Sequence, residues 1–265
     1  MSSKSPDAAI ARFEAPAAWR AIDLISDLHL AADHPRTFDA WRRHLLHTPA
    51  DAVFILGDLF ELWVGDDSRV EGFERECAQV LIQAGQRRPL AFMPGNRDFM
   101  VGDEMLADCG ATRLHDPTLL SAWGSQWLLT HGDALCLDDI DYQRFRTKVR
   151  DPAWQQAVLA RPLAERRSIA SGMRHASEAM KATGGPWVDI DQDAAVAWLR
   201  ASGSNVMIHG HTHQPGDSEI APGFLRHVLS DWDLDSPQPR AEVLRFTPTG
   251  LRRLGLQEAL SGTAC

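Results

Sequence analysis

The chain has 265 residues, of which 44% are hydrophobic and 24% charged, and its formal net charge is −9. That length and apolar content support a sizeable core, which excludes general intrinsic disorder and the class of small disulfide-stapled scaffolds. The sequence contains no run of about 20 apolar residues that could span a bilayer. Its excess of carboxylates disfavours nucleic acid as a partner.

The first residues, 1–18, are rich in Ala, Ser and Pro and lack the apolar segment of a secretory signal, so we predict a flexible tail. After it, short apolar runs alternate with longer polar-periodic segments, as in α/β proteins. The predicted strands are 21–26, 52–56, 90–93, 126–130, 206–208, 225–229 and 241–246, and the predicted helices are 37–47, 72–84, 102–109, 142–149 and 191–201. Four scattered cysteines without a CxxC pair are typical of reduced thiols in a cytosolic protein.

Residues 139–185 have few strand signals, scattered arginines and interleaved apolar residues, and Pro152 and Pro162 divide them into short helices. Two interpretations are open for this segment. It is either a helical connector packed on the sheet or a cap over an active site, apolar inside and basic at its edge. Periodicity alone favours the connector.

Five predicted strands are each followed by a polar cluster. The clusters are Ser26-Asp27-Leu28-His29, Gly57-Asp58-Leu59-Phe60-Glu61, Gly95-Asn96-Arg97-Asp98, His131-Gly132-Asp133 and Gly210-His211-Thr212-His213. Ligands bind at the carboxyl ends of the strands in an open α/β sheet. Clusters from separate strands can therefore converge in space, and the spacing between successive clusters fits one strand–helix unit per step.

Such a convergence would create a site for metal ions. The candidate ligands are Asp27, His29, Asp58, Asn96, His131, His211 and His213. Seven mixed nitrogen and oxygen ligands are too many for one tetrahedral zinc site, and they suit two ions that share a bridging carboxylate, in the range of manganese or iron. Two such ions about 3.5–4 Å apart would clamp a phosphoryl group and activate a water. Each cluster alone has a structural alternative, such as a turn at Gly-Asp, but their joint occurrence favours the dinuclear site.

The ordered set of clusters resembles the calcineurin-like metallophosphoesterase superfamily over most of the chain, from about Ala21 to about Phe246. The resemblance implies an α/β fold, a sandwich of two mixed β-sheets flanked by helices, with a helical lid insertion and a dinuclear metal centre at one end. It implies one ion bound by Asp27, His29, Asp58 and His213. It implies a second ion bound by Asp58, Asn96, His131 and His211, with Asp58 bridging.

Segments 55–67, 95–99, 131–136 and 208–213 resemble more closely the UDP-2,3-diacylglucosamine diphosphatases of the lipid A pathway. This resemblance implies that the pyrophosphate bond of UDP-2,3-diacylglucosamine is hydrolysed to UMP and 2,3-diacylglucosamine 1-phosphate, with two Mn²⁺ ions per chain. It implies a domain over 19–256 with a lid at about 139–185, and a C-terminal tail over 257–265. It also implies a lipid-nucleotide substrate, no obligate protein partner, and a cytoplasmic location, peripheral to the inner membrane of a Gram-negative bacterium.

Single residues near the clusters have expected roles. The predicted catalytic residues are Arg97, Asp58 and His131, and the predicted substrate contacts are Asn96, Arg97, Asp139, Ser177, Lys181 and His211. Arg97 is expected to stabilise charge on the phosphoryl oxygens, rather than only to pair with Asp98. Glu61 and Asp98 are interpreted as hydrogen-bond partners of ligating histidines, and His209 as a hydrogen-bonding residue behind the ligands. For Asp139, substrate binding and an N-cap role before Tyr142 both stay open.

Two other functions remain as alternatives. The first is a general metallophosphoesterase that cleaves a phosphoprotein, a cyclic nucleotide or a dinucleoside polyphosphate. The second is a metal-poor scaffold that keeps the fold and binds a partner protein, which an intact ligand set disfavours.

Overall fold

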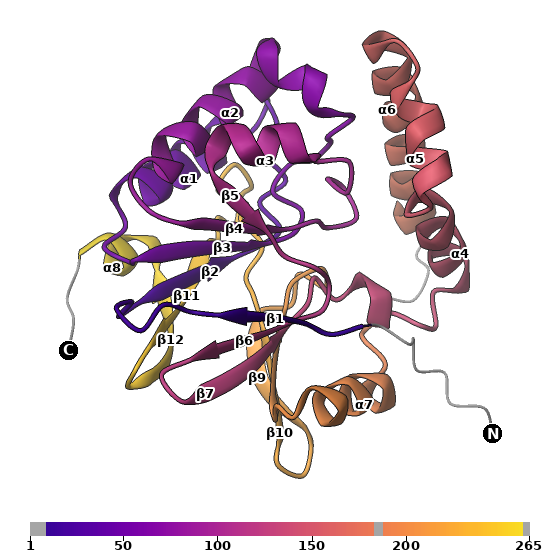
Figure 1. Ribbon diagram of the computed structural model, residues 1–265. Coiled ribbons are helices and arrows are strands. Elements are labelled where there is room, and N and C mark those ends of the chain that lie inside the picture. Colours follow the sequence, from indigo (N-terminus) through magenta and orange to yellow (C-terminus); the bar gives the residue numbers. More distant parts are fainter. Residues whose placement is uncertain (1–8, 183–187, 262–265) are drawn as a thin grey trace.

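Two six-stranded sheets face each other in the computed structural model, which describes residues 9–182 and 188–261, although not the side chains of 174–182 (Figure 1). The first sheet has the order β1 (Ala11–Glu14), β6 (Thr118–Ala122), β7 (Ser125–Leu129), β8 (Val206–His209), β10 (Phe224–Val228) and β9 (Gly216–Ala221). The second has the order β12 (Gly250–Gly255), β11 (Glu242–Thr247), β2 (Ile22–Ile25), β3 (Ala52–Leu56), β4 (Leu90–Met93) and β5 (Ala111–Arg113). Both combine parallel and antiparallel pairs, so the predicted mixed sandwich is confirmed.

Helices cover the outer face of each sheet. Helices α1 (Pro35–His47), α2 (Gly72–Gly85) and α3 (Asp103–Cys109) lie over the second sheet, and α7 (Gln192–Ser202) lies beside the first. The short helix α8 (Leu256–Ser261) contacts α1, β11 and β12. Two 3-10 turns, η1 (Asp66–Val70) and η2 (Asp133–Leu135), follow β3 and β7.

The alternation of side chains along the strands builds the layers. In β3, Phe54 points between the two sheets, whereas Val53 and Ile55 point under the helices. Successive residues of a strand face opposite sides, and both sides are covered, so all five residues of β3 are buried. The strand therefore delivers the loop that follows it from a rigid, dry core.

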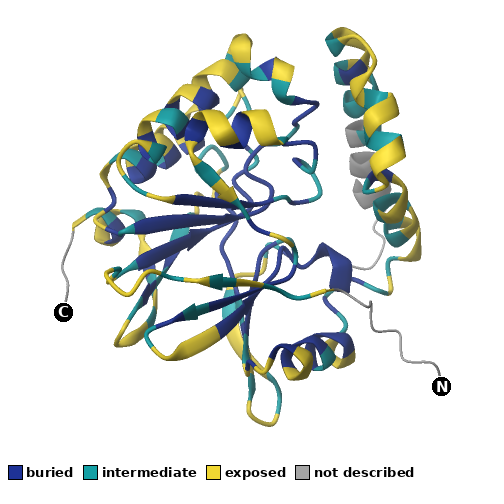
Figure 2. Ribbon diagram, viewed as in Figure 1, coloured by how far each residue is buried: buried dark blue, intermediate teal, exposed yellow. Residues whose placement is uncertain are grey.

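A helical arm, defined here as α4 (Ile140–Val149), α5 (Pro152–Leu159) and α6 (Leu163–Ala182), extends beside the sandwich (Figure 1). The predicted division at Pro152 and Pro162 is confirmed, since α5 begins at one proline and α6 follows the other. The described side chains of the arm are mostly exposed or half-buried (Figure 2): α4 buries only Val149, and α5 buries none of its residues.

Several edge elements differ from the sequence prediction. The flexible tail predicted over 1–18 is wrong for residues 11–14, which form β1 and pair in parallel with β6. The tail predicted over 257–265 is likewise wrong for residues 257–261, which belong to α8, and residues 262–265 lie outside the described part of the chain. The strands β1, β5, β6, β9 and β12 were not predicted; most are short or half-exposed, so their side chains carry a weak apolar pattern. No helix in the described part of the chain is both long and apolar enough to cross a membrane.

Candidate metal centre

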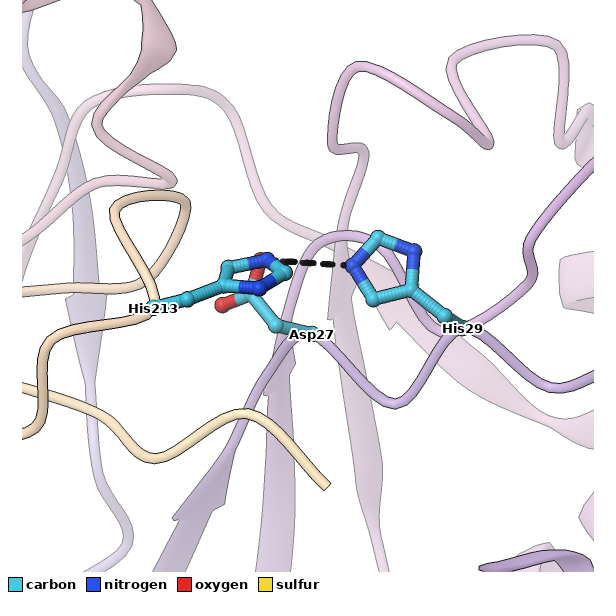
Figure 3. Close-up of side chains that lie close together, drawn as sticks. All are labelled: Asp27, His29 and His213. Atoms are coloured by element: carbon cyan, nitrogen blue, oxygen red, sulfur yellow. Dashed lines mark hydrogen bonds and ion pairs between the residues drawn. The ribbon is translucent and has the colours of Figure 1, made fainter. Parts of the chain in front are cut away.

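The carboxyl ends of β2, β3, β4, β7 and β8 lead into the five polar clusters, and the structure brings the candidate ligands together there. One group joins the loop after β2 to the loop after β8 (Figure 3). In it, Nε2 of His29 lies 3.2 Å from Nε2 of His213. Oδ1 of Asp27 lies 3.4 Å from the same His213 nitrogen. Residues almost two hundred positions apart in sequence thus share one small volume.

A second group lies around Asp58 and Asn96. Nε2 of His131 is 3.7 Å from Asp58 Oδ1 and 3.1 Å from Asn96 Oδ1. Nδ1 of His211 is 2.8 Å from that same Asn96 oxygen. Asp58 also lies 3.8 Å from Nε2 of His29, so it stands between the two groups. The convergence expected of the seven residues is therefore present.

Local backbone geometry aims these side chains. Six non-glycine residues of the described chain have a positive φ, and five are candidate ligands, at φ values from 46° to 65°: Asp27, His29, Asp58, His211 and His213. The left-handed region costs a residue with a side chain about 1–3 kcal/mol, and such residues gather at functional sites. The surrounding sandwich holds the loops in these conformations, which turns the ligands inward.

Close backbone approach explains two glycines of the clusters. A Cβ on Gly95 would overlap the carboxylate and the amide of Asp58, and a Cβ on Gly210 would overlap Asp27 and Ser26. Glycine is therefore required where these ligand loops touch.

Asp98 has a different role from the one predicted. Its buried carboxylate accepts backbone N–H groups, at 2.7 Å from Gly95 and 2.8 Å from Leu59, and a longer bond of 3.3 Å from Asp58. The prediction that Asp98 partners a ligating histidine is wrong, because the side chain turns back to its own and a neighbouring loop. It fixes the loops of Asp58 and Asn96 against each other.

Acidic side chains and a carbonyl surround the ligand rings, and among them is Glu61, which was predicted as a partner of the ligating histidines. Glu61 Oε2 lies 2.9 Å from Nδ1 of His29, and Asp231 Oδ2 lies 3.5 Å from Nδ1 of His213. His131 donates from Nδ1 to the carbonyl of Leu56 over 2.9 Å. With Nδ1 protonated against these acceptors, Nε2 is the ring atom that would bind a metal in place of a proton.

The electrostatics of the site favour a cation. Burial disfavours the charged form of His131, but Asp58 and Asp27 reverse this and raise its pKa to about 9. Burial likewise opposes ionisation of Asp27, yet His213 and the neighbouring histidines hold its pKa below the usual range. Burial and the charge of His131 lower the pKa of His211 to about 4, so this ring stays neutral. The carboxylates thus stabilise positive charge between them.

The residues present fit divalent ions. Oδ1 of Asp27 is buried without a hydrogen-bond donor of ordinary geometry, and the Nε2 atoms of His29 and His213 face each other beside it. A bare carboxylate oxygen next to two imidazole lone pairs is a set of donors that a divalent cation satisfies.

Arg97 lies at the rim of this site. Its backbone N–H donates to Asp58 Oδ1 over 2.8 Å, and its guanidinium is 3.6 Å from Glu61. The guanidinium therefore pairs with Glu61 and not with Asp98, the partner that the sequence suggested. It stays partly exposed, and Arg97 directly follows Asn96 in the chain.

The remaining predicted residues have mixed outcomes. Asp139 is the N-cap of α4 and accepts from the Tyr142 backbone over 3.0 Å. His209 is buried, 2.7 Å from the carbonyl of Gly210 through Nδ1, and accepts from Arg226 at Nε2. Burial and Arg226 lower the pKa of His209 to about 3. Ser177 and Lys181 lie outside the residues whose side chains are described.

Sequence reasoning missed a group of residues that joins the arm to the site. Asp133 is buried and receives hydrogen bonds from Tyr142 and Arg146. One signal was available: Tyr142, Arg146 and Arg150 recur every four residues and so share one face of a helix. Their common carboxylate could not be identified without the fold.

The fold and the site define a class of protein. The chain belongs to the calcineurin-like phosphoesterase family, whose model matches residues 21–215. This family membership implies divalent metal ions, and the described residues include two groups that could hold a metal ion, Asp27 with His29 and His213, and Asp27 with Asp58 and His131.

Closer relatives come from bacteria and carry one name. A "UDP-2,3-diacylglucosamine hydrolase" of Chromobacterium violaceum is 45% identical over 80% of this chain and 90% of its own length. A protein of the same name from Ralstonia nicotianae is 44% identical over 84% of this chain and 87% of its own. A third, from Aromatoleum aromaticum, is 41% identical over 82% and 91%.

Proposed function

We propose that this protein hydrolyses the pyrophosphate bond of UDP-2,3-diacylglucosamine to UMP and 2,3-diacylglucosamine 1-phosphate. One observation carries the proposal. Seven nitrogen- and oxygen-bearing side chains converge at one end of the sandwich, in a chain whose relatives are named hydrolases of this lipid nucleotide. The reaction class is metal-dependent hydrolysis.

The two groups of side chains are assigned to two Mn²⁺ ions. One ion is assigned to Asp27, His29, Asp58 and His213, and the other to Asp58, Asn96, His131 and His211. Mixed imidazole, carboxylate and amide ligands suit manganese or iron better than a closed zinc site. When bound, such ions polarise phosphoryl oxygens and lower the pKa of a coordinated water.

The side chains of the site complete the chemistry. Arg97, partly exposed next to Asn96, is placed to contact the phosphoryl oxygens and to stabilise their charge in the transition state. Glu61 contacts both Arg97 and His29, so it orients the guanidinium and one imidazole together. Asp98 keeps the loop of Asn96 in place through its backbone hydrogen bonds.

The helical arm is assigned as the lid, over about 139–185, that receives the acyl chains. Its exposed apolar side chains include Ile140 and Leu159, at 61% and 44% exposure. Apolar side chains next to arginines suit a lipid with a phosphate head, and they support peripheral attachment to the cytoplasmic face of the inner membrane. Asp139, Ser177 and Lys181 are proposed substrate contacts of this lid.

A substrate panel tests the proposal. We expect the purified enzyme with Mn²⁺ to cleave UDP-2,3-diacylglucosamine faster than a cyclic nucleotide, a dinucleoside polyphosphate or a phosphopeptide, and chelation to abolish the activity. Faster cleavage of another member of the panel would replace the assignment by the general phosphoesterase. Binding of less than one metal ion per chain after purification with Mn²⁺ would favour the scaffold.

A further inference from the structure

One face of the arm's first helix meets a single buried carboxylate. The hydroxyl of Tyr142 donates to Asp133 Oδ2 over 2.6 Å, and Nε of Arg146 donates to the same oxygen over 2.8 Å. Nη2 of Arg150 lies 3.9 Å from it. Because these residues are spaced by four, they share the side of α4 that is turned toward the site.

Asp133 is fully buried and lies two residues after His131. Its Oδ2 accepts hydrogen bonds from Tyr142 and Arg146, and the guanidinium of Arg150 lies within ionic reach of the same oxygen. Hydrogen bonds to a buried charged acceptor are strong, and an acceptor that loses them is costly. The hydrogen bonds to this carboxylate therefore hold α4 against the loop that contains Asp133.

The same helix touches the other loops of the second ligand group. Nη2 of Arg150 donates to the carbonyl of Gly95 over 2.8 Å, directly before Asn96. Nε2 of Gln143 donates to the carbonyl of Asp133 over 2.8 Å. The ring of Tyr142 lies 5.8 Å from that of His211, with an angle of 32° between their planes. Helix α4 thus contacts the loops that supply Asn96, His131 and His211.

Apolar packing does not explain the position of α4. Its one buried residue is Val149, near its end, and Tyr142, Arg146 and Arg150 are all only half-buried. The polar contacts of Tyr142, Arg146 and Arg150 therefore determine where α4 lies.

We propose that Asp133 is a positioning residue: it docks α4 against three ligand loops, so that the docked arm is a structural part of the second ligand group. When α4 leaves Asp133, the rings and the amide of that group lose their support. The inference rests on the proposed function in one respect, that Asn96, His131 and His211 act in hydrolysis.

The test compares Tyr142→Phe and Asp133→Asn with a matched control on the same helix, Arg144→Gln. Arg144 has a 77% exposed side chain and pairs with Asp141, away from the site. Four quantities are measured on the full chain: hydrogen exchange of residues 140–150 with Mn²⁺ supplied, Mn²⁺ affinity by calorimetry, kcat and KM. The substrates are the lipid nucleotide and the small diester bis(p-nitrophenyl) phosphate.

We expect Tyr142→Phe to speed exchange in α4 and to lower kcat on both substrates by about tenfold each, the size of one lost hydrogen bond to a charged group. In Tyr142→Phe the affinity for one of the two Mn²⁺ ions should also fall. Arg144→Gln should match the wild type in exchange, Mn²⁺ affinity, kcat and KM. If Asp133→Asn does not fold, Tyr142→Phe decides the outcome.

Two results would overturn the inference. One is unchanged exchange in α4 of Tyr142→Phe. The other is faster exchange with wild-type Mn²⁺ affinity and wild-type kcat on the diester, which would uncouple docking from the site. A wild-type enzyme that fails on the lipid nucleotide would instead contradict the proposed substrate, and the exchange and Mn²⁺ measurements would still test the role of Asp133.

Discussion

Strand β3 is buried at all five of its residues and leads directly into Asp58, whereas helix α5 of the arm buries none of its eight. The ligand loops therefore inherit their position from an apolar core beneath them. The arm has no comparable core among its described residues and is attached through Tyr142 and arginine side chains. Segments with few buried apolar contacts open at low free energy.

The difference separates two kinds of function. A preorganised metal centre needs side chains fixed within fractions of an ångström, and the strained backbone at Asp27 and Asp58 is tolerated because the core holds it. The lid proposed for the arm must move to admit a large substrate, and contacts such as that of Arg166 with Asp67 can break and form again. Substitutions in the ligand loops and at the Arg166 contact of the arm should consequently affect different kinetic constants.

The largest effect is expected from the ligand loops. Asp58→Ala and His131→Ala should each lower kcat by about 10³-fold or more, because both remove a group around which the site is built. The unfolding midpoint should change little. The measurement is kcat with Mn²⁺ supplied, together with thermal unfolding, and exposed His47→Ala is the control. Near-normal rates in either variant would contradict the dinuclear site.

The ligand loops could be predicted from sequence because each is local. A buried strand followed at once by Asp-x-His or Gly-His-Thr-His carries its own signal, and parallel strands bring such ends together. The direction of a side chain is less local, which is why Asp98 was misassigned: it lies next to two site residues but points to backbone N–H groups.

The attachments of the arm could not be predicted in the same way. Arg166 donates to the carbonyl of Val64, 102 residues earlier. The sequence around either residue contains no pattern that predicts this contact. Strand β1 is a similar case. Its four residues alternate between half-buried and exposed, and only the pairing with β6 more than a hundred residues later makes them a strand.

As the pH falls, the stability of the sandwich should decrease before the ion pair between Arg166 and Asp67 in the arm is lost. Burial lowers the pKa of His44 on α1 from 6.5 to about 4, although Asp23 opposes the shift. As the pH falls, His44 is protonated in the unfolded chain before it is protonated in the folded one. The contribution of neutral His44 to the free energy of unfolding is therefore complete above pH 6.5 and is lost as the pH falls toward 4, up to about 3 kcal/mol. On the arm's side, Arg166 lowers the pKa of Asp67, and that ion pair persists over the same range.

Urea unfolding of the wild type, His44→Leu and His47→Gln at pH 7.5 and 4.5 measures this. His47 is the exposed control on the same helix. The loss of stability between the two pH values should be smaller in His44→Leu than in the other two proteins. An equal loss in all three would show that His44 does not titrate as its burial predicts.

Release of the arm's far end should alter substrate binding without altering the centre. Arg166 is 3% exposed, donates to Val64 over 2.6 Å and pairs with Asp67. For Arg166→Gln we expect KM for the lipid nucleotide to rise about tenfold or more, because the charged hydrogen bonds to Val64 and Asp67 are lost, with kcat on a small diester within about twofold of the wild type. The control is Arg161→Gln, whose side chain is 54% exposed. A fall of kcat on the diester would mean that this contact supports the metal centre as well.

The smallest expected effect distinguishes the two interpretations of Asp139. As the N-cap of α4, it accepts the backbone N–H of Tyr142. Asp139→Ala should therefore loosen the first turn of α4 by about 1 kcal/mol, whereas Asp139→Asn should restore it, because asparagine caps as well as aspartate. Hydrogen exchange of α4 and KM for the lipid nucleotide are measured together. If Asp139→Asn restores both, capping is sufficient. If it restores exchange but leaves KM as high as in Asp139→Ala, the carboxylate contacts the substrate, and the arm contributes a binding residue in addition to its cover.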